Sequence, residues 1–181
     1  IVLITLITFG VNHRNSRQSQ IDAMNNSMNI LVDEFAKRIA NEMKDIEVIA
    51  LMGRDYVESS DYVSYPEAVN WLKNNLFYNE YLMGSGLAFE PEYSNGALRL
   101  QAVTRLNGEI VTRDLYSKIN YLLPNELWYA IPKKTGKPYW QDAFKDRVTG
   151  ITGSRYSVPM YKNGKFIGVS SARIELSGLK D

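Results

Sequence analysis

The sequence contains no cysteine and only one histidine, His13. Without cysteine the chain can form no disulfide bond, no thiolate metal site and no thiol nucleophile, and one histidine cannot build a multi-histidine zinc site. A Ser-His-Asp triad would have to use His13, which lies in a polar stretch beside the apolar N-terminal segment. These absences exclude most nucleophilic and metal-dependent chemistry, and we expect neither a metal nor a cofactor.

The sequence also lacks a run of charge of one sign. Its 21 basic and 20 acidic residues are interspersed and give a formal net charge of +1. A nucleic-acid-binding protein normally clusters lysine and arginine on one surface, so we expect no nucleic-acid partner. The 181 residues are enough for one globular domain with its own core and an appended segment.

The chain begins with an apolar, uncharged segment, residues 1–10 (IVLITLITFG). Ten residues span about 15 Å as a helix, roughly half the hydrocarbon core of a bilayer. We interpret residues 1–12 as the outer end of a truncated transmembrane helix. Two alternatives remain: a signal-peptide remnant, which no small-residue cleavage site supports, and a β-strand rich in isoleucine and threonine.

Residues 13–53 are predicted to form a long amphipathic helix. Residues 16–52 contain neither proline nor glycine, and apolar residues recur there at steps of three and four. The residues of this stripe are Ile21, Met24, Met28, Leu31, Phe35, Ile39, Met43, Ile46 and Ala50. Gly53 is expected to end the helix. A helix of roughly 50 Å is longer than a small sheet can bury, which predicts a homodimer through this helix; the alternative is a helix packed wholly against its own domain.

Residues 54–181 are predicted to form an α+β domain. A second helix is expected over residues 61–81, and the Gly-Ser-Gly sequence at 84–86 is expected to break the chain after it. About five antiparallel strands should follow, with a mixed segment of short helix and loop at 109–137. The expected strands are 87–90, 97–105, 139–141, 151–161 and 165–176. The last two flank an Asn-Gly pair, the strongest short-range signal for a hairpin.

Several short pieces of the C-terminal half, taken in order, resemble the extracytoplasmic Cache domain of bacterial receptors, a PAS-like sensor fold. They are GLAFEP at 86–91, LWY at 127–129, PYW at 138–140, YSVP at 156–159, FIGV at 166–169 and IEL at 174–176. The resemblance implies a long N-terminal helix followed by a PAS-like antiparallel sheet with flanking helices. It also implies a position outside the membrane, facing the periplasm or the extracellular space.

The function that the resemblance implies is sensing rather than catalysis. Cache domains bind small molecules in a pocket between the sheet and the loop region before the third strand, and they report through helices to a cytoplasmic output. That output can be a chemoreceptor tail, a histidine kinase, a serine phosphatase or a cyclic-di-nucleotide enzyme. The candidate ligand-binding residues are Trp128, Tyr129, Arg173, Tyr156, Glu126, Trp140 and Asp146.

Two of these candidates depart from the family pattern. Members that bind amino acids carry an arginine two residues before the Trp-Tyr pair and an aspartate in the final strand, whereas this sequence has Glu126 and Arg173. The reversed charges disfavour an α-amino acid in the usual orientation, because a buried carboxylate would face the ligand carboxylate. In one interpretation Arg173 anchors an organic anion, and three aromatic residues shape the pocket, Tyr129, Tyr156 and Trp128. In the other, Glu126 and Arg173 pair with each other and the pocket is vestigial.

The charged residues that follow Trp140 have two interpretations. Asp142 and Asp146 either line the pocket or lie in solvent, and the pattern favours solvent; two carboxylates without further oxygen ligands make a poor calcium site. Arg147 and Arg155 either assist an anion or form a solvated face.

Two other classes of protein remain open. An enzyme would have to use carboxylates, as in glycoside hydrolysis, yet no pair of acidic residues stands out by its spacing. A ligand-free structural or dimerisation module is the other alternative. A thermal-shift screen separates the three classes, because only a sensor is stabilised by a specific ligand without converting it.

Overall fold

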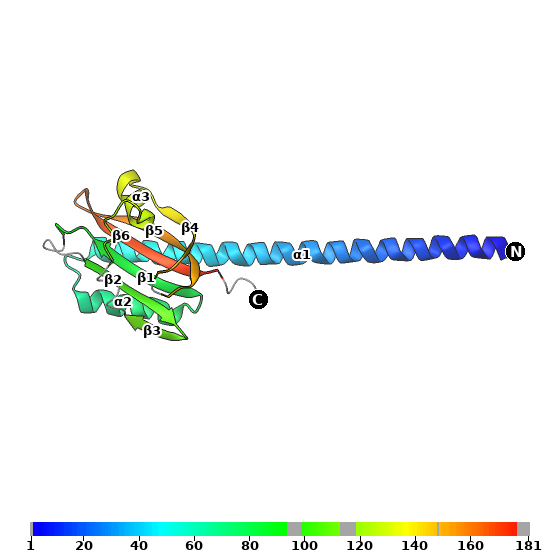
Figure 1. Ribbon diagram of the computed structural model, residues 1–181, viewed down its shortest axis with the longest axis horizontal. Helices are drawn as coiled ribbons and strands as arrows, with labels where there is room; N and C mark the ends of the chain where they lie inside the picture. Colours follow the sequence, from blue (N-terminus) through cyan, green and yellow to red (C-terminus); the bar gives the residue numbers. More distant parts are fainter. Residues whose placement is uncertain (1, 94–98, 113–118, 148, 177–181) are drawn as a thin grey trace. The chain divides into compact units, whose positions relative to one another are not determined.

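The computed structural model of the chain describes residues 2–93, 99–112, 119–147 and 149–176, and it describes side chains from residue 11 onward. The chain divides into two compact units, Ile1–Asn41 and Glu42–Asp181. Helix α1 belongs to both units, and the second unit adds α2, α3 and six strands (Figure 1). The predicted α+β class, a long N-terminal helix followed by an antiparallel sheet, is confirmed.

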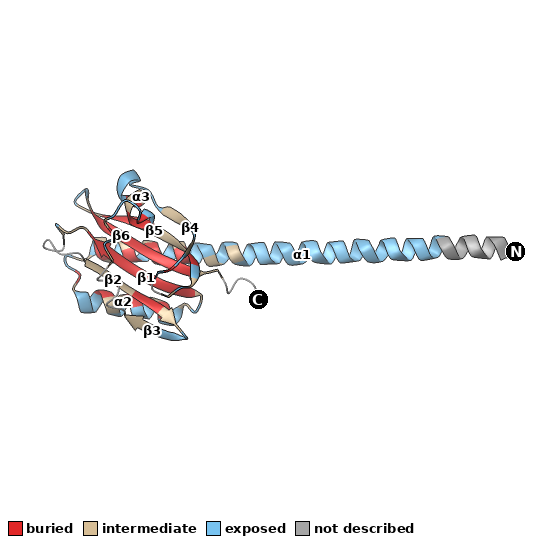
Figure 2. Ribbon diagram, in the orientation of Figure 1, coloured by how far each residue is buried: buried red, intermediate tan, exposed pale blue. Residues whose placement is uncertain are grey.

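The sheet is antiparallel between every pair of neighbours, and its strand order is β3-β2-β1-β6-β5-β4. The strands are β1 (Leu82–Phe89), β2 (Arg99–Leu106), β3 (Glu109–Thr112), β4 (Tyr139–Lys145), β5 (Thr152–Lys162) and β6 (Lys165–Glu175). Strands β1 and β6 lie at the centre and are buried along almost their whole length, whereas β3 and β4 form partly exposed edges (Figure 2).

The predicted hairpin of the last two strands is present as β5 and β6. Asn163 and Gly164 join them with φ angles of 51° and 75°, the left-handed values that a type I′ turn requires. A second Asn-Gly pair at 107–108 joins β2 to β3 in the same way. Strand β3 was not expected, because four residues are too few to show a period, and it raises the strand count to six.

The expected chain break at 84–86 is wrong. Strand β1 runs straight through the Gly-Ser-Gly sequence and begins at Leu82. Its two glycines lie where neighbouring groups approach closely: a Cβ on Gly84 would lie 2.4 Å from Arg173 Nη2, and one on Gly86 would lie 3.3 Å from the Gln101 carbonyl oxygen. Glycine inside a strand here marks a close approach rather than a turn.

Helix α1 covers Val2–Ser59 and continues through Gly53, so the expected stop there is also wrong. A Cβ on Gly53 would lie 2.3 Å from Ser170 Oγ and 3.2 Å from the Trp71 ring. Glycine therefore lets the helix pack closely against β6, and this packing outweighs its poor helix propensity. Within the described residues, no helix is both long and apolar enough to cross a membrane. The interpretation of residues 1–12 stays a prediction.

Helix α2 covers Tyr65–Tyr78, inside the expected range of 61–81. Ser64 begins it with a capping box: the Ser64 side chain accepts a hydrogen bond from the Glu67 backbone N–H, and the Glu67 carboxylate accepts one from the Ser64 backbone N–H at 3.1 Å. Pro66 lies in the first turn, where its missing N–H costs nothing. Ala68, Leu72 and Leu76 form the buried face of the helix.

The two faces of the sheet carry separate apolar clusters. On one face, α1 and α2 pack against strand residues such as Leu87, Val158 and Ala172. On the other face, α3 (Leu127–Thr135) packs against Ala88 and Val169. Neighbouring strand residues such as Leu87 and Ala88 belong to different clusters because successive side chains of a strand point to opposite faces. The candidate site lies on the α3 face.

Candidate functional site

A cavity of about 260 Å³ lies on the α3 face of the sheet. Its walls come from five strands (β1, β2, β4, β5 and β6), from α3 and the segment before it, and from the loop between β4 and β5. Among the described lining residues four are basic, Lys145, Arg147, Arg155 and Arg173, and two are acidic, Glu126 and Asp146. The rest are apolar or uncharged. The cavity therefore combines a polar, positively charged wall with an apolar one.

Strand register places Arg173 and Arg155 together. They are direct partners across the β5–β6 ladder, and Gly84 of β1 is the partner of Arg173 on its other side. Because Gly84 has no side chain, the guanidinium of Arg173 lies over the β1 backbone. The two arginines therefore form adjacent cationic groups on the floor of the cavity.

Asp146 binds both arginines. It forms an ion pair with Arg173 in which both side chains are about 6% exposed, and its Oδ2 lies 4.0 Å from Arg155 Nη2. Its other oxygen accepts hydrogen bonds from the Thr149 backbone N–H at 2.8 Å and the Thr149 hydroxyl at 3.1 Å. Arg173 also donates to Thr104 Oγ1 at 3.2 Å. The expectation that Asp146 lies in solvent is wrong, whereas Asp142 is exposed.

Arg155 is stacked between two aromatic rings. Its guanidinium carbon lies 4.7 Å from the centre of the Trp128 ring and 5.0 Å from that of Phe144. Stacking of this kind holds the guanidinium plane in place while its N–H groups remain in that plane. Arg155 is thereby fixed in orientation beside the cavity.

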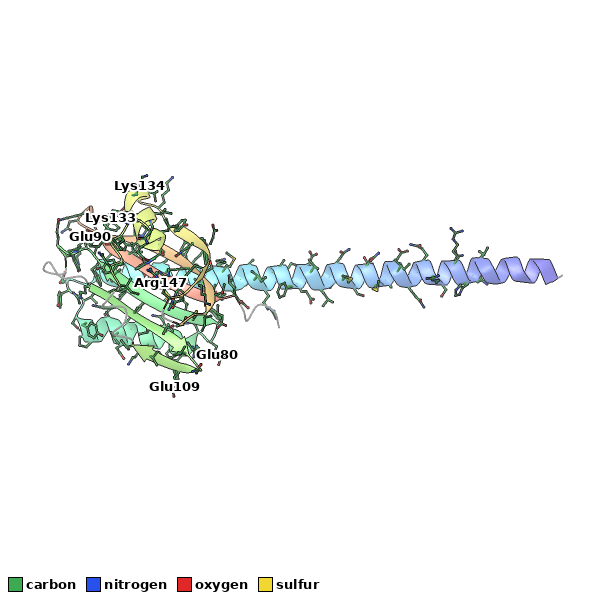
Figure 3. All side chains as sticks on the ribbon, viewed as in Figure 1. Glu80, Glu90, Glu109, Lys133, Lys134 and Arg147 are labelled. Atoms are coloured by element: carbon green, nitrogen blue, oxygen red, sulfur yellow. The ribbon has the colours of Figure 1, made fainter. Side chains whose placement is uncertain are left out.

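Glu126 and Arg147 form a second ion pair on the cavity wall. Glu126 is buried and also accepts a hydrogen bond from the Trp128 indole N–H at 3.1 Å, whereas the side chain of Arg147 is 66% exposed (Figure 3). Glu126 and Arg173 do not pair with each other, because the Glu126 carboxylate binds Arg147 and Trp128. The pair joins the start of α3 to the β4–β5 loop.

The predicted site residues divide into two groups. Trp128, Glu126, Asp146 and Arg173 line the cavity. Tyr129 does not: its hydroxyl donates to Glu90 Oε1 at 2.6 Å, the same oxygen that receives Lys133 Nζ at 2.6 Å (Figure 3). Burial, together with the neighbouring Glu90 carboxylate, raises the pKa of Tyr129 far above its usual value, so this hydroxyl stays protonated.

Trp140 and Tyr156 lie on the opposite face of the sheet. The Trp140 indole N–H donates to Glu47 Oε1 of α1 at 2.8 Å, and its ring packs against Tyr156 at 5.1 Å between centres. Burial, and then the charge of Glu47, raises the pKa of Tyr156. Neither residue is part of the cavity wall.

Sequence reasoning left the role of Arg155 open and did not select Phe144. The alternation of side chains along β4 and β5 is the sequence signal that could have indicated both residues. Arg155 and Tyr156 are neighbours in β5, so only one of them can face the cavity, and the strand register decides which. No group of three histidine, cysteine or acidic side chains able to hold a metal occurs among the residues described. The charged side chains of the cavity wall offer polar contacts to a small charged molecule.

The family model of the methyl-accepting chemotaxis protein-like first PDC sensor domain matches residues 68–181, which is more than half of the chain. A comparison with curated proteins gives no match.

Three solved structures with the same fold are each less than 25% identical to the chain and therefore show the fold alone. The extracellular domain of a chain assigned as a histidine kinase, soHK1S-Z6, is 20% identical with a TM-score of 0.72, covering 80% of this chain and 57% of that one. The ligand-binding domain of the Pseudomonas aeruginosa PAO1 amino acid chemoreceptor PctC, in complex with GABA, is 14% identical with a TM-score of 0.60, covering 85% and 62%. The sensory domain of the Campylobacter jejuni chemoreceptor Tlp3 with isoleucine bound is 18% identical with a TM-score of 0.55, covering 81% and 59%. The chain thus spans about three fifths of these structures.

Proposed function

Because the chain belongs to the family of methyl-accepting chemotaxis protein-like first PDC sensor domains, we propose that it senses a small organic anion in the cavity on the α3 face. The observation that carries this proposal is the charge of the wall, where four basic and two acidic residues are found among those described. A cavity of about 260 Å³ is smaller than the roughly 300–1,000 Å³ clefts that hold drug-sized ligands. The ligand is accordingly a small acid.

Two features of the wall favour a carboxylate. Arg155 is fixed by stacking between Trp128 and Phe144, and Arg173 is fixed by Asp146 and Thr104, so both guanidinium groups are ordered before the ligand arrives. An ordered guanidinium binds a carboxylate through two parallel N–H···O bonds with little further loss of entropy. Each acid of the wall is paired with an arginine, Glu126 with Arg147 and Asp146 with Arg173. On the β5–β6 side Arg155 and Arg173 outnumber Asp146, so we propose that the ligand carboxylate lies there.

Binding is tested by isothermal titration with acetate, lactate, pyruvate, succinate, malate, citrate and benzoate, and with GABA and isoleucine, the ligands of two structural neighbours. We expect at least one acid to bind, and Arg173→Ala to abolish its binding. The matched control is Lys134→Ala, which removes an exposed cation of α3 outside the cavity wall (Figure 3). If only GABA or isoleucine binds, the ligand class is a zwitterion and not an organic anion. If no compound binds, the result favours a ligand-free module.

The exposed stripe of α1 supports a homodimer. Five apolar residues at steps of three and four are each more than two fifths exposed, Ile21, Met24, Met28, Leu31 and Phe35. Burying a stripe of this kind against a second copy is the arrangement of a coiled coil. We expect Leu31→Glu to shift the chain from dimer to monomer in sedimentation velocity. Asn26→Glu, on the opposite side of the helix, serves as the control; a monomer in both variants and in the parent chain would contradict the dimer.

We propose that the domain lies outside the cytoplasm of a membrane receptor and that its output is one of the modules found in such receptors, for example a histidine kinase or a chemoreceptor tail. A structural neighbour is named as an extracellular domain, which supports this position. The chain lacks cysteine, so Lys134→Cys adds a single exposed thiol to it. In intact cells that produce the full receptor, a membrane-impermeant maleimide should label this variant more than the parent. Labelling only after lysis would place the domain in the cytoplasm.

A further inference from the structure

The contact between Trp140 and Glu47 joins strand β4 to helix α1 on the side of the sheet opposite the cavity. The Trp140 indole N–H donates to Glu47 Oε1 at 2.8 Å. A hydrogen bond to a charged acceptor is among the stronger ones in a protein. Glu47 lies within the Glu42–Asp181 unit, next to Ile46, which is fully buried in the core.

The residue after Trp140 faces the cavity. Gln141 lines the cavity wall, and Phe144 further along β4 lines it as well. Trp140 and Gln141 point to opposite faces because successive side chains of a strand alternate. A displacement of this part of β4 by a ligand therefore moves the indole of Trp140 on the other face.

Strand β4 is held less firmly than the other strands that line the cavity. It is an edge strand paired only with β5, and its register with β5 is interrupted between Gln141 and Phe144. An irregularity of this kind leaves part of the ladder without paired hydrogen bonds. Two of the β4 residues that line the cavity, Gln141 and Phe144, thus bracket this interruption of the ladder.

Helix α1 is anchored to the sheet at a different place. Glu58, near the end of α1, accepts a hydrogen bond from the Tyr161 backbone N–H at 2.7 Å, close to the β5–β6 turn. Earlier in the helix, Gly53 packs against Ser170 of β6. Glu58 and Tyr161 are not among the residues that line the cavity. The segment around Glu47 is therefore the part of α1 that β4 contacts, whereas Glu58 contacts the β5–β6 hairpin.

We infer that Trp140 and Glu47 transmit the state of the cavity to α1. This inference rests on the proposed sensor function and names the residues that couple the site to the helix. A ligand that repositions Gln141 and Phe144 shifts Trp140, and the hydrogen bond to Glu47 passes the shift to residues 42–52 of α1. The two residues are positioning residues, because neither contacts the ligand.

The test uses hydrogen–deuterium exchange of backbone amides in residues 42–52, measured relative to α2 as a reference for global unfolding. No ligand is needed, because Phe144→Ala perturbs the cavity directly. We expect Phe144→Ala to change the exchange rate of residues 42–52 by about threefold or more, as for residues that share one network. In a Glu47→Ala background the same substitution should change that rate by less than about 1.5-fold, because the hydrogen bond that couples the two sites is gone and the effects are no longer additive. Trp140→Phe, which removes the donor N–H and keeps an aromatic ring, should have the same effect as Glu47→Ala.

Two controls distinguish transmission from general destabilisation. Glu58→Ala removes a second glutamate of α1 that accepts a hydrogen bond from the sheet, and in that background Phe144→Ala should keep its full effect. Leu100→Ala alters the cavity from β2 rather than β4 and should leave the exchange of residues 42–52 unchanged relative to α2. Equal effects of Phe144→Ala with and without Glu47, or no effect in either, would overturn the inference. The proposed function is judged separately by the titration, because either experiment can fail without the other.

Discussion

The buried ion pair between Asp146 and Arg173 gives a prediction with a large expected magnitude. Asp146→Asn preserves the shape of the side chain and leaves an oxygen to accept the two Thr149 hydrogen bonds, but it removes the charge that faces Arg173. Since both side chains are about 6% exposed, water cannot replace the lost carboxylate. Leaving one partner of a buried pair uncompensated costs about 3–5 kcal/mol.

That cost is measurable by urea denaturation followed by circular dichroism. With an m-value of about 2 kcal/mol per molar urea, the transition midpoint should fall by about 1.5–2.5 M. The matched control is Glu92→Gln in the pair between Glu92 and Lys165, whose side chains are 74% and 70% exposed. Because water solvates both of these groups, the control should leave the midpoint unchanged.

A double variant separates the lost ion pair from lost packing. Arg173→Met alone leaves Asp146 without its arginine partner in the pair, and we expect a cost similar to that of Asp146→Asn. Asp146→Leu combined with Arg173→Met replaces both charges by apolar groups, so its cost should be well below the sum of the costs of Asp146→Leu and Arg173→Met. Each variant changes the free energy of unfolding relative to the parent chain. If the changes for the two single variants add up to the change for the double variant, the two side chains are not a coupled buried pair and the reasoning is refuted.

Three further predictions follow from other contacts. Gly84→Ala should weaken acid binding at least tenfold in the titration and destabilise the fold by about 1–3 kcal/mol, because the new Cβ would lie 2.4 Å from the Arg173 guanidinium; unchanged affinity would contradict the placement of that arginine. Tyr129→Phe should lower stability by about 1.5–3 kcal/mol and leave acid affinity unchanged, since its hydroxyl binds a glutamate outside the cavity; a loss of affinity would place it in the site. Hydrogen bonds from the Ser64 side chain and backbone lower the pKa of Glu67 in the fold, so their stabilisation is present above the unfolded pKa of about 4.3 and is lost as the pH falls through the lower folded value. Between pH 6 and 3 the parent chain should therefore lose more stability than Ser64→Ala, and equal losses would count against the capping box.

The sequence predicted those parts of the fold that depend on local signals. Residues 16–52 are helical because no proline or glycine interrupts an apolar stripe, and the β5–β6 hairpin forms at Asn163 and Gly164 because both accept positive φ. The errors concern glycines whose role is tertiary. Gly53 and Gly84 lie in the middle of regular elements because another part of the chain packs against them, and no local pattern distinguishes such a glycine from a helix stop or a turn.

The candidate site was less predictable than the fold because it depends on strand register. A shift of one residue moves a side chain to the other face of the sheet. Trp128, Glu126 and Arg173 line the cavity, whereas Tyr156 faces α1 and its neighbour Arg155 faces the cavity. Two ion pairs of the site, Glu126–Arg147 and Asp146–Arg173, could not be predicted from the sequence either, since their partners are 21 and 27 residues apart.

The alternation along β5 and β6 has an evolutionary consequence. Arg155, Ser171 and Arg173 face the cavity, while Tyr156 and Ala172 between them pack toward the long helix. Residues that line the cavity therefore alternate along the chain with residues that pack against the helix. A saturation library at cavity-facing positions such as Arg155 and Ser171 changes the cavity while the interleaved residues Tyr156 and Ala172 stay unchanged. Substitution at such positions is one route by which receptors with a common architecture diverge toward different stimuli.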